Sequence, residues 1–170
     1  MGRLRDRRSN GGDVHRFRMR EKLASIGDDF WIEDEQGERA FRVDGKALRI
    51  RDTFVLEDAS GREVATIQER KLSVRDKVAI ERDGRTVATV HKALVGIRDR
   101  FAIDVDGAPD LKAHGNIVDH EYEIERDGDT VARISKRWFR IRDTYGVEIE
   151  DGEDDALVLA MVVALEALTD

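Results

Sequence analysis

The sequence contains no cysteine and only one proline. Without cysteine the chain has no disulfide framework, no thiolate metal site and no cysteine nucleophile. It also lacks the Gly-x-Ser-x-Gly elbow, the P-loop, the dinucleotide fingerprint and the His-Glu-x-x-His motif. Carboxylates occur throughout the chain, so no single pair of them indicates acid–base chemistry. These absences predict a protein that is not an enzyme and that uses neither a cofactor nor a metal.

Basic residues are missing from the C-terminal part, where no lysine or arginine follows Arg142 and nine acidic residues do. The net charge of −7 argues against nucleic acid as a partner, since general binding to it requires a basic surface. No apolar segment follows the basic N-terminus, so we expect no signal peptide and a cytoplasmic protein. Residues 1–14 predict a flexible basic tail ahead of one domain over 15–170.

Four segments of 23 residues align without gaps, at 30–52, 54–76, 77–99 and 121–143. Each ends in Ile-Arg-Asp or Val-Arg-Asp and has glycine at its eighth position, at Gly37, Gly61, Gly84 and Gly128. Apolar residues alternate within each segment, which is typical of β-strands with one buried face. The segments therefore predict β-hairpins, and Asp83-Gly84 fits a type I′ turn. In the first two segments the apolar residues before the glycine stand one position earlier than in the other two. This difference predicts that the first two turns are one residue longer, or bulged.

A run of hairpins that must hide its edge strands is expected to close into an antiparallel β-barrel. Residues 156–165, ALVLAMVVAL, are apolar on every side and are too few to span a bilayer. Glu153, Asp154 and Asp155 precede them and suit the positive end of a helix dipole. We expect a helix over 154–168 that passes through the centre of the barrel and fills it.

The chain resembles the LURP-one-related proteins. The resemblance rests on Met19-Arg20-Glu21-Lys22, Gly27-Asp28-Asp29-Phe30, Val43-Asp44-Gly45-Lys46, Ile141-Arg142-Asp143-Thr144-Tyr145 and the apolar segment 156–165. It implies the tubby-like fold, a closed antiparallel barrel of about twelve strands around a hydrophobic C-terminal helix, shared with the phospholipid scramblase superfamily. Tubby-type domains bind phosphoinositide headgroups through basic side chains on the barrel wall, whereas no general activity is established for LURP-one-related proteins.

The strongest basic cluster is Lys136-Arg137-Trp138-Phe139-Arg140-Ile141-Arg142. As a strand, this segment would place Lys136, Trp138, Arg140 and Arg142 on one face, and Arg137 is its remaining basic residue. Cations beside an exposed tryptophan suit an anionic headgroup or an acidic partner, and we take these five residues as the candidate ligand-binding site. The alternative interpretation is a solvated strand face whose cations pair with neighbouring acids.

His114 and His120 would face the same side of a strand, but the sequence identifies no third ligand, so no metal site is predicted. Residues 104–110 predict a hairpin turn rather than a calcium loop, because the glycine spacing and distal glutamate of an EF-hand are missing. The functional hypothesis is a non-enzymatic binding module for anionic phospholipid headgroups, which would act peripherally at a membrane surface. The alternative hypothesis is a structural or protein-interaction scaffold without affinity for lipid.

Overall fold

The computed structural model describes residues 13–20, 29–44, 53–70, 77–93, 100–138 and 142–169. These residues form twelve strands, one short 3₁₀ helix and one α-helix. The strands are β1 (Val14–Arg20), β2 (Phe30–Asp34), β3 (Arg39–Asp44), β4 (Thr53–Asp58), β5 (Glu63–Arg70), β6 (Lys77–Arg82), β7 (Arg85–Lys92), β8 (Arg100–Val105), β9 (Leu111–Asn116), β10 (Glu121–Arg126), β11 (Asp129–Ser135) and β12 (Thr144–Glu150). The helices are η2 (Lys136–Trp138) and α2 (Asp155–Thr169).

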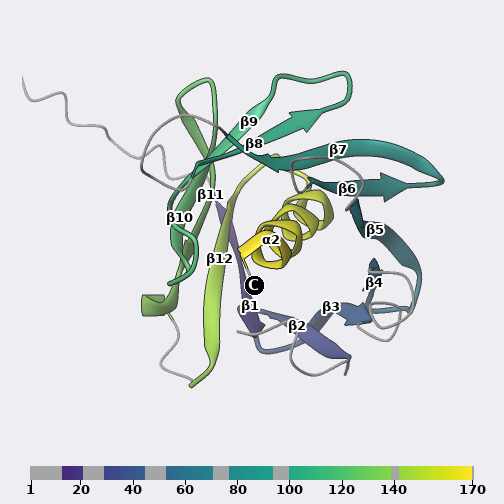
Figure 1. Ribbon diagram of the computed structural model, residues 1–170. Coiled ribbons are helices and arrows are strands. Elements are labelled where there is room, and N and C mark those ends of the chain that lie inside the picture. Colours follow the sequence, from purple (N-terminus) through teal and green to yellow (C-terminus); the bar gives the residue numbers. More distant parts are fainter. Residues whose placement is uncertain are drawn as a thin grey trace, which may run out of the picture.

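The strands form a closed antiparallel barrel in which each strand pairs with its neighbours in sequence (Figure 1). Antiparallel pairing of β1 with β12, from Val14 opposite Glu150 to Arg20 opposite Thr144, completes the ring. Closure leaves the sheet without an edge strand, as expected for a hairpin meander. The predicted closed barrel is therefore confirmed.

The hairpin turns differ in length, as the positions of the apolar residues before each turn predict. Ile32 lies opposite Phe41, whereas Ile80 lies opposite Ala88, so the first hairpin encloses one residue more than the third. The third hairpin is the expected type I′ turn, since Asp83 and Gly84 have φ angles of 50° and 74°. Three of the four Arg-Asp segment ends, at 51–52, 75–76 and 98–99, lie outside the described residues.

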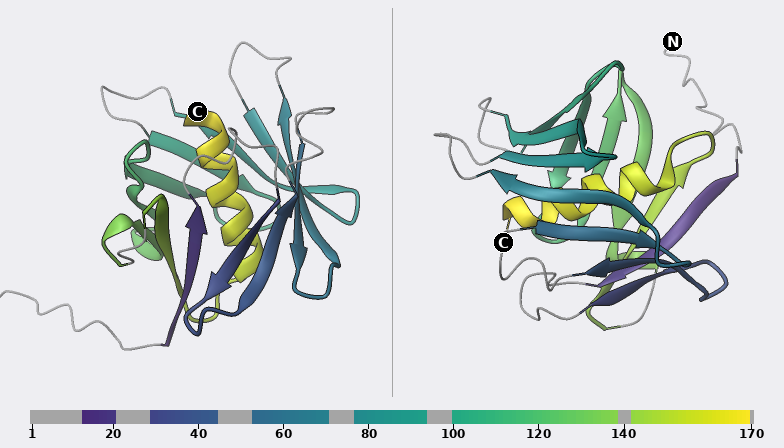
Figure 2. Two further views of the ribbon diagram at one scale, coloured as in Figure 1. Left: turned by 90° about the horizontal axis from the view of Figure 1, so that it is seen from below. Right: turned by 90° about the vertical axis from the view of Figure 1, so that its right-hand side faces the viewer.

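The two ends of the barrel have different connections. Because consecutive strands are antiparallel, the tight turns 35–38, 59–62, 83–84, 106–110 and 127–128 lie together with 151–154, at what we call the turn end. The turn 117–120, η2 and residues 142–143 lie at the opposite end, the loop end. Helix α2 begins at the turn end and runs toward the loop end (Figure 2).

Helix α2 occupies the interior of the barrel (Figure 1). Every residue from Val158 to Glu166 is buried, and the helix lies nearest to β5 and β6. Its bounds, Asp155–Thr169, agree with the predicted central helix to within one residue at each end. Twelve strands enclose more space than inward side chains alone would fill, since roughly eight strands already match that limit. The helix is therefore the middle of the hydrophobic core.

Three strands hold the start of α2 through ion pairs with three consecutive acids. These pairs come from β10, β6 and β1, so the helix entry is anchored to separate parts of the wall. The pairs are Arg126–Glu153 (2.7 Å), Arg82–Asp154 (2.6 Å) and His15–Asp155 (2.9 Å). Asp154 Oδ1 also accepts a hydrogen bond from the Leu157 N–H at 3.1 Å, which is the bond of an N-cap residue.

We expect Asp154→Ala to destabilise the fold by about 1 kcal/mol for the lost cap, with at most about 1 kcal/mol in addition for the lost Arg82 contact. The hydrogen bond from Arg82 lowers the pKa of Asp154. A lowered pKa stabilises the folded state above the unfolded-state value and stops doing so as pH falls through the folded-state value. Urea unfolding at pH 7 and pH 3 should therefore show a difference between wild type and variant that shrinks in acid.

Asp151→Ala is the matched control, because Asp151 belongs to the same acidic run and lies before the cap. It should unfold close to wild type at both pH values. An Asp154→Ala variant as stable as the control at pH 7 would contradict the proposed role of this helix entry.

Candidate functional site

The basic segment at 136–142 begins with a 3₁₀ helix, so the prediction of a strand there is wrong for Lys136, Arg137 and Trp138. The reason is a carboxylate on the neighbouring strand: Glu121 Oε1 accepts hydrogen bonds from Ser135 Oγ at 3.0 Å and from the Lys136 N–H at 3.1 Å. These bonds end β11 and turn the chain. The alternation of faces expected for a strand therefore does not apply.

Four of the five predicted ligand-binding residues nevertheless lie at the loop end. Lys136, Arg137 and Trp138 are exposed on η2, and the Arg142 side chain is 94% exposed, with its Nε 3.8 Å from Asp143. The fifth, Arg140, lies outside the described residues, as does most of the predicted basic tail, residues 1–12. The loop end thus presents three cations and a tryptophan.

A second apolar side chain is exposed on the same end. Among the described residues, Val118 (61% exposed) and Trp138 (37%) are the exposed large hydrophobic side chains. Val118 lies in the turn between β9 and β10, which is joined to η2 through the Glu121 bonds. A close backbone approach supports this turn, because a Cβ at Gly115 would lie 2.7 Å from the Glu121 carbonyl oxygen. Two neighbouring connections therefore expose apolar groups beside cations.

A groove opens between β1 and β2, which among the described residues pair at Phe17–Asp34 and Arg18–Glu33 alone. Toward the loop end it forms a cavity of about 270 Å³. Its polar and aromatic lining includes Arg18, Arg20, Asp29, Trp31, Arg39 and Thr144. The sequence gives no clear signal for this groove, because Arg18 and Arg20 come from β1 whereas Arg39 comes from β3.

Two contacts organise the side chains of this groove. Arg18 forms an ion pair with Glu33, and the Arg39 guanidinium lies 4.9 Å from the centre of the Trp31 ring, in cation–π geometry. The groove also borders the start of β12, because Arg20 pairs with Thr144. It therefore lies beside the connection that carries Arg142.

Acidic side chains concentrate at the turn end. Its six turns contain nine acidic residues and one basic residue, Arg62. The acidic residues are Glu35, Glu38, Asp83, Asp106, Asp110, Asp127, Asp151, Glu153 and Asp154. The described connections of the loop end instead contain three basic residues, Lys136, Arg137 and Arg142, against three acids, Asp29, Asp119 and Asp143. The turn end of the barrel is therefore more negatively charged than the described part of the loop end.

The outer wall carries charges that alternate in sign across the strands. On β10, β11, β12 and β1, Glu123 lies opposite Arg133, Arg133 opposite Glu148, and Glu148 opposite Arg16. The last pair is 2.9 Å apart, and Arg42 and Glu57 form a similar pair on β3 and β4. Such cross-strand pairs neutralise the wall locally. The wall is therefore a solvated strand surface with paired charges, whereas the described part of the basic segment lies at the loop end.

A buried polar cluster lies inside the barrel near the end of α2. His120 and Glu166 are both buried, and Nδ1 of His120 lies 2.8 Å from Oε1 of Glu166. The His120 ring stacks on Tyr145 with 4.3 Å between ring centres. Burial and the nearby Glu166 carboxylate raise the pKa of Tyr122 well above its usual range, so its hydroxyl keeps a proton 3.5 Å from the same Oε1.

The expectation that His114 and His120 face the same side is wrong. His114 is a half-buried residue of β9 paired with Glu125, whereas His120 ends the following turn, with a φ of 53°, and points into the barrel. Glu166 is the single charged residue between 156 and 168, which is the signal in the sequence that could have indicated a buried partner.

The fold defines the class of closed antiparallel barrels built around a central C-terminal helix. The chain belongs to the LURP-one-related family, whose model matches residues 15–166. A protein from Arabidopsis thaliana, known from an X-ray structure, is similar in fold, with 20% identity, a TM-score of 0.68 and coverage of 92% of each chain. A comparison with curated proteins gives no match. No helix among the described residues is long and apolar enough to cross a membrane.

We expect Glu166→Leu to destabilise the fold by about 3 kcal/mol or more, because it leaves a buried imidazole without its carboxylate. His120→Asn is the companion variant, since asparagine tolerates the positive φ of this position. A double-mutant cycle measured by urea unfolding should give a coupling energy of about 0.5–3 kcal/mol. Additive effects of the two substitutions would show that the pair does not act as a unit.

Proposed function

We propose that this LURP-one-related barrel is a non-enzymatic binding module that attaches peripherally to anionic phospholipid surfaces through its loop end. The observation that carries the proposal is the joint exposure of Trp138 and Val118 beside Lys136, Arg137 and Arg142. Tryptophan favours the membrane–water interface, and arginine forms paired hydrogen bonds with phosphate oxygens. This combination suits a lipid headgroup layer better than a purely aqueous surface.

The expected affinity is weak and depends on salt. Each basic residue near an anionic surface contributes about 1 kcal/mol, so three contribute about 3 kcal/mol. The millimolar range corresponds to about 4 kcal/mol, and the exposed apolar groups supply the remainder. Binding of this strength serves recruitment to a membrane rather than permanent anchoring.

The net charge of −7 does not oppose this orientation, because the acids of the turn end face away from the surface. A strand such as β12, with 7 residues, separates the two ends by roughly 20 Å. The Debye length at physiological salt is about 8 Å, so repulsion from the turn end is largely screened.

The groove between β1 and β2 supports recognition of a phosphorylated headgroup. Arg18, Arg20 and Arg39 line it beside Trp31, together with Asp29 and Glu33, the partner of Arg18. The groove also borders the connection that carries Arg142. In this proposal, η2 contacts the bilayer surface while the groove accepts a headgroup phosphate. Arg39 is held by its contact with Trp31, which limits the entropy lost on binding.

Co-sedimentation with liposomes tests the proposal. The probes are neutral phosphatidylcholine vesicles and vesicles that also contain phosphatidylserine or a phosphoinositide, at low and physiological salt. We expect binding to the anionic vesicles only, weaker at higher salt. Arg137→Ala/Arg142→Ala should lose most of this binding, and Trp138→Ala should reduce it at both salt concentrations.

Arg62→Ala/Arg85→Ala is the matched control, because it removes the same charge from exposed arginines at the turn end. The control should bind like wild type. Equal losses in the two double variants would show that net charge rather than the loop end governs binding. No binding to any vesicle would refute the proposal and leave a protein-interaction scaffold as the function to test.

A further inference from the structure

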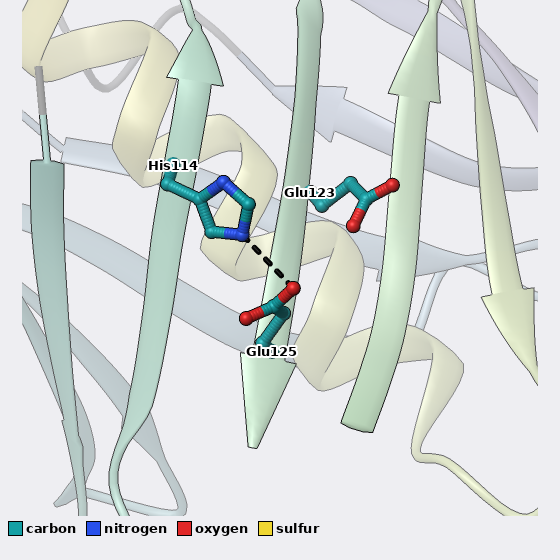
Figure 3. Close-up of side chains that lie close together, drawn as sticks. All are labelled: His114, Glu123 and Glu125. Carbon is teal, nitrogen blue, oxygen red and sulfur yellow. Dashed lines mark ion pairs between the residues drawn. The ribbon is translucent and has the colours of Figure 1, made fainter. Parts of the chain in front are cut away.

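A polar cluster on the outer wall combines one histidine with two glutamates from adjacent strands (Figure 3). His114 comes from β9, and Glu123 and Glu125 come from β10; one ligand atom from each lies within 4.8 Å of the other two. We propose that this cluster binds a divalent transition-metal ion such as Zn²⁺. The proposal concerns the wall and is independent of membrane binding by the loop end.

The strand register explains why these three side chains meet. His114 pairs directly with Glu123, and Glu125 lies two residues further along β10 on the same face. Directly opposed residues have Cβ atoms about 5 Å apart, and the diagonal neighbour is within reach of a long side chain. His114 Nε2 is already 3.0 Å from Glu125 Oε1. The rigid barrel therefore holds the three donors close together before any ion arrives.

The donor set matches the chemistry of a dication. Zinc binds imidazole nitrogen and carboxylate oxygen at about 2.1 Å, so ligand atoms around it lie about 3.4 Å apart in a tetrahedron. Side-chain rotations would bring the donors from their present spacing to that distance. Two carboxylates and a neutral imidazole would balance the charge of the ion. Three protein ligands leave a fourth position for water.

Solvent can reach the cluster. All three side chains are half-buried, and His114 and Glu125 line a surface cavity of about 530 Å³ beside Ala102. The fourth coordination position is therefore open to water or to a small anionic ligand.

Arg133 on β11 competes with the ion for Glu123. Its Nε lies 3.4 Å from Glu123 Oε1, and Arg133 is the residue opposite Glu123 in the sheet. A metal must displace this contact and bind beside a positive charge. Removal of the guanidinium should therefore tighten metal binding, whereas removal of the imidazole should weaken it. A site that formed only a salt-bridge network would give neither effect.

The experiment is isothermal titration of ZnCl₂ into tag-free, EDTA-treated protein at pH 7.5, with Co²⁺ absorption as a second readout. We expect one site per chain in wild type. His114→Gln should weaken binding about tenfold or more, since even outer-shell substitutions at metal sites cost 10–100-fold. Arg133→Gln should tighten it. Zn²⁺ should also raise the melting temperature of wild type but not of His114→Gln.

His91→Gln is the matched control. His91 also lies on the wall 3.1 Å from a carboxylate, that of Asp104, but it belongs to no group of three metal-binding side chains among the described residues. This variant should bind Zn²⁺ like wild type. Equal affinity in wild type and His114→Gln, or no binding at millimolar Zn²⁺ in a folded wild type, would overturn the proposal. Circular dichroism of every variant confirms that the fold is kept.

Discussion

The rest of the structure depends on filling the interior of a twelve-stranded closed barrel. Inward side chains of that many strands leave space along the axis, and an empty apolar space forfeits dispersion contacts. Helix α2 occupies this space, and its residues from Val158 to Glu166 are buried on every side. A helix that is apolar all round suits such a position and would be poorly solvated elsewhere. Barrel and helix therefore require each other.

The entry of the helix into the barrel adds to the negative charge of the turn end. Its first turn needs acids for the dipole and the cap, and Asp154 and Asp155 are held by residues of β6 and β1. These acids add to those that the hairpin turns already carry at the turn end. The opposite end is left with exposed cations and Trp138, which is the arrangement that a peripheral lipid-binding surface would use.

The sequence predicted most of the fold because the fold is built from local, repeated patterns. Three features are sufficient to predict the hairpins and their turn lengths. They are the alternation of apolar residues, the turn glycines, and the position of Ile80 in its segment, one residue later than that of Ile32. The site was less predictable because it depends on tertiary contacts. Glu121 turns Lys136 out of the strand, and the barrel encloses His120 while it leaves His114 on the wall. The grouping of His114 with Glu123 and Glu125 becomes visible only in the register of β9 and β10, because these two strands do not belong to the same repeat unit.

Native-state hydrogen exchange tests most directly whether helix and barrel form one cooperative unit. If the barrel cannot persist without its filling, the amides of Leu159–Leu165 exchange only through global unfolding. Their free energy of exchange should then equal that of the central amides of β6 and β7. Both free energies should fall with the same slope as denaturant is added. Exchange of the helix amides at a clearly lower free energy than these strands would show that the barrel stands without α2, and would contradict the account.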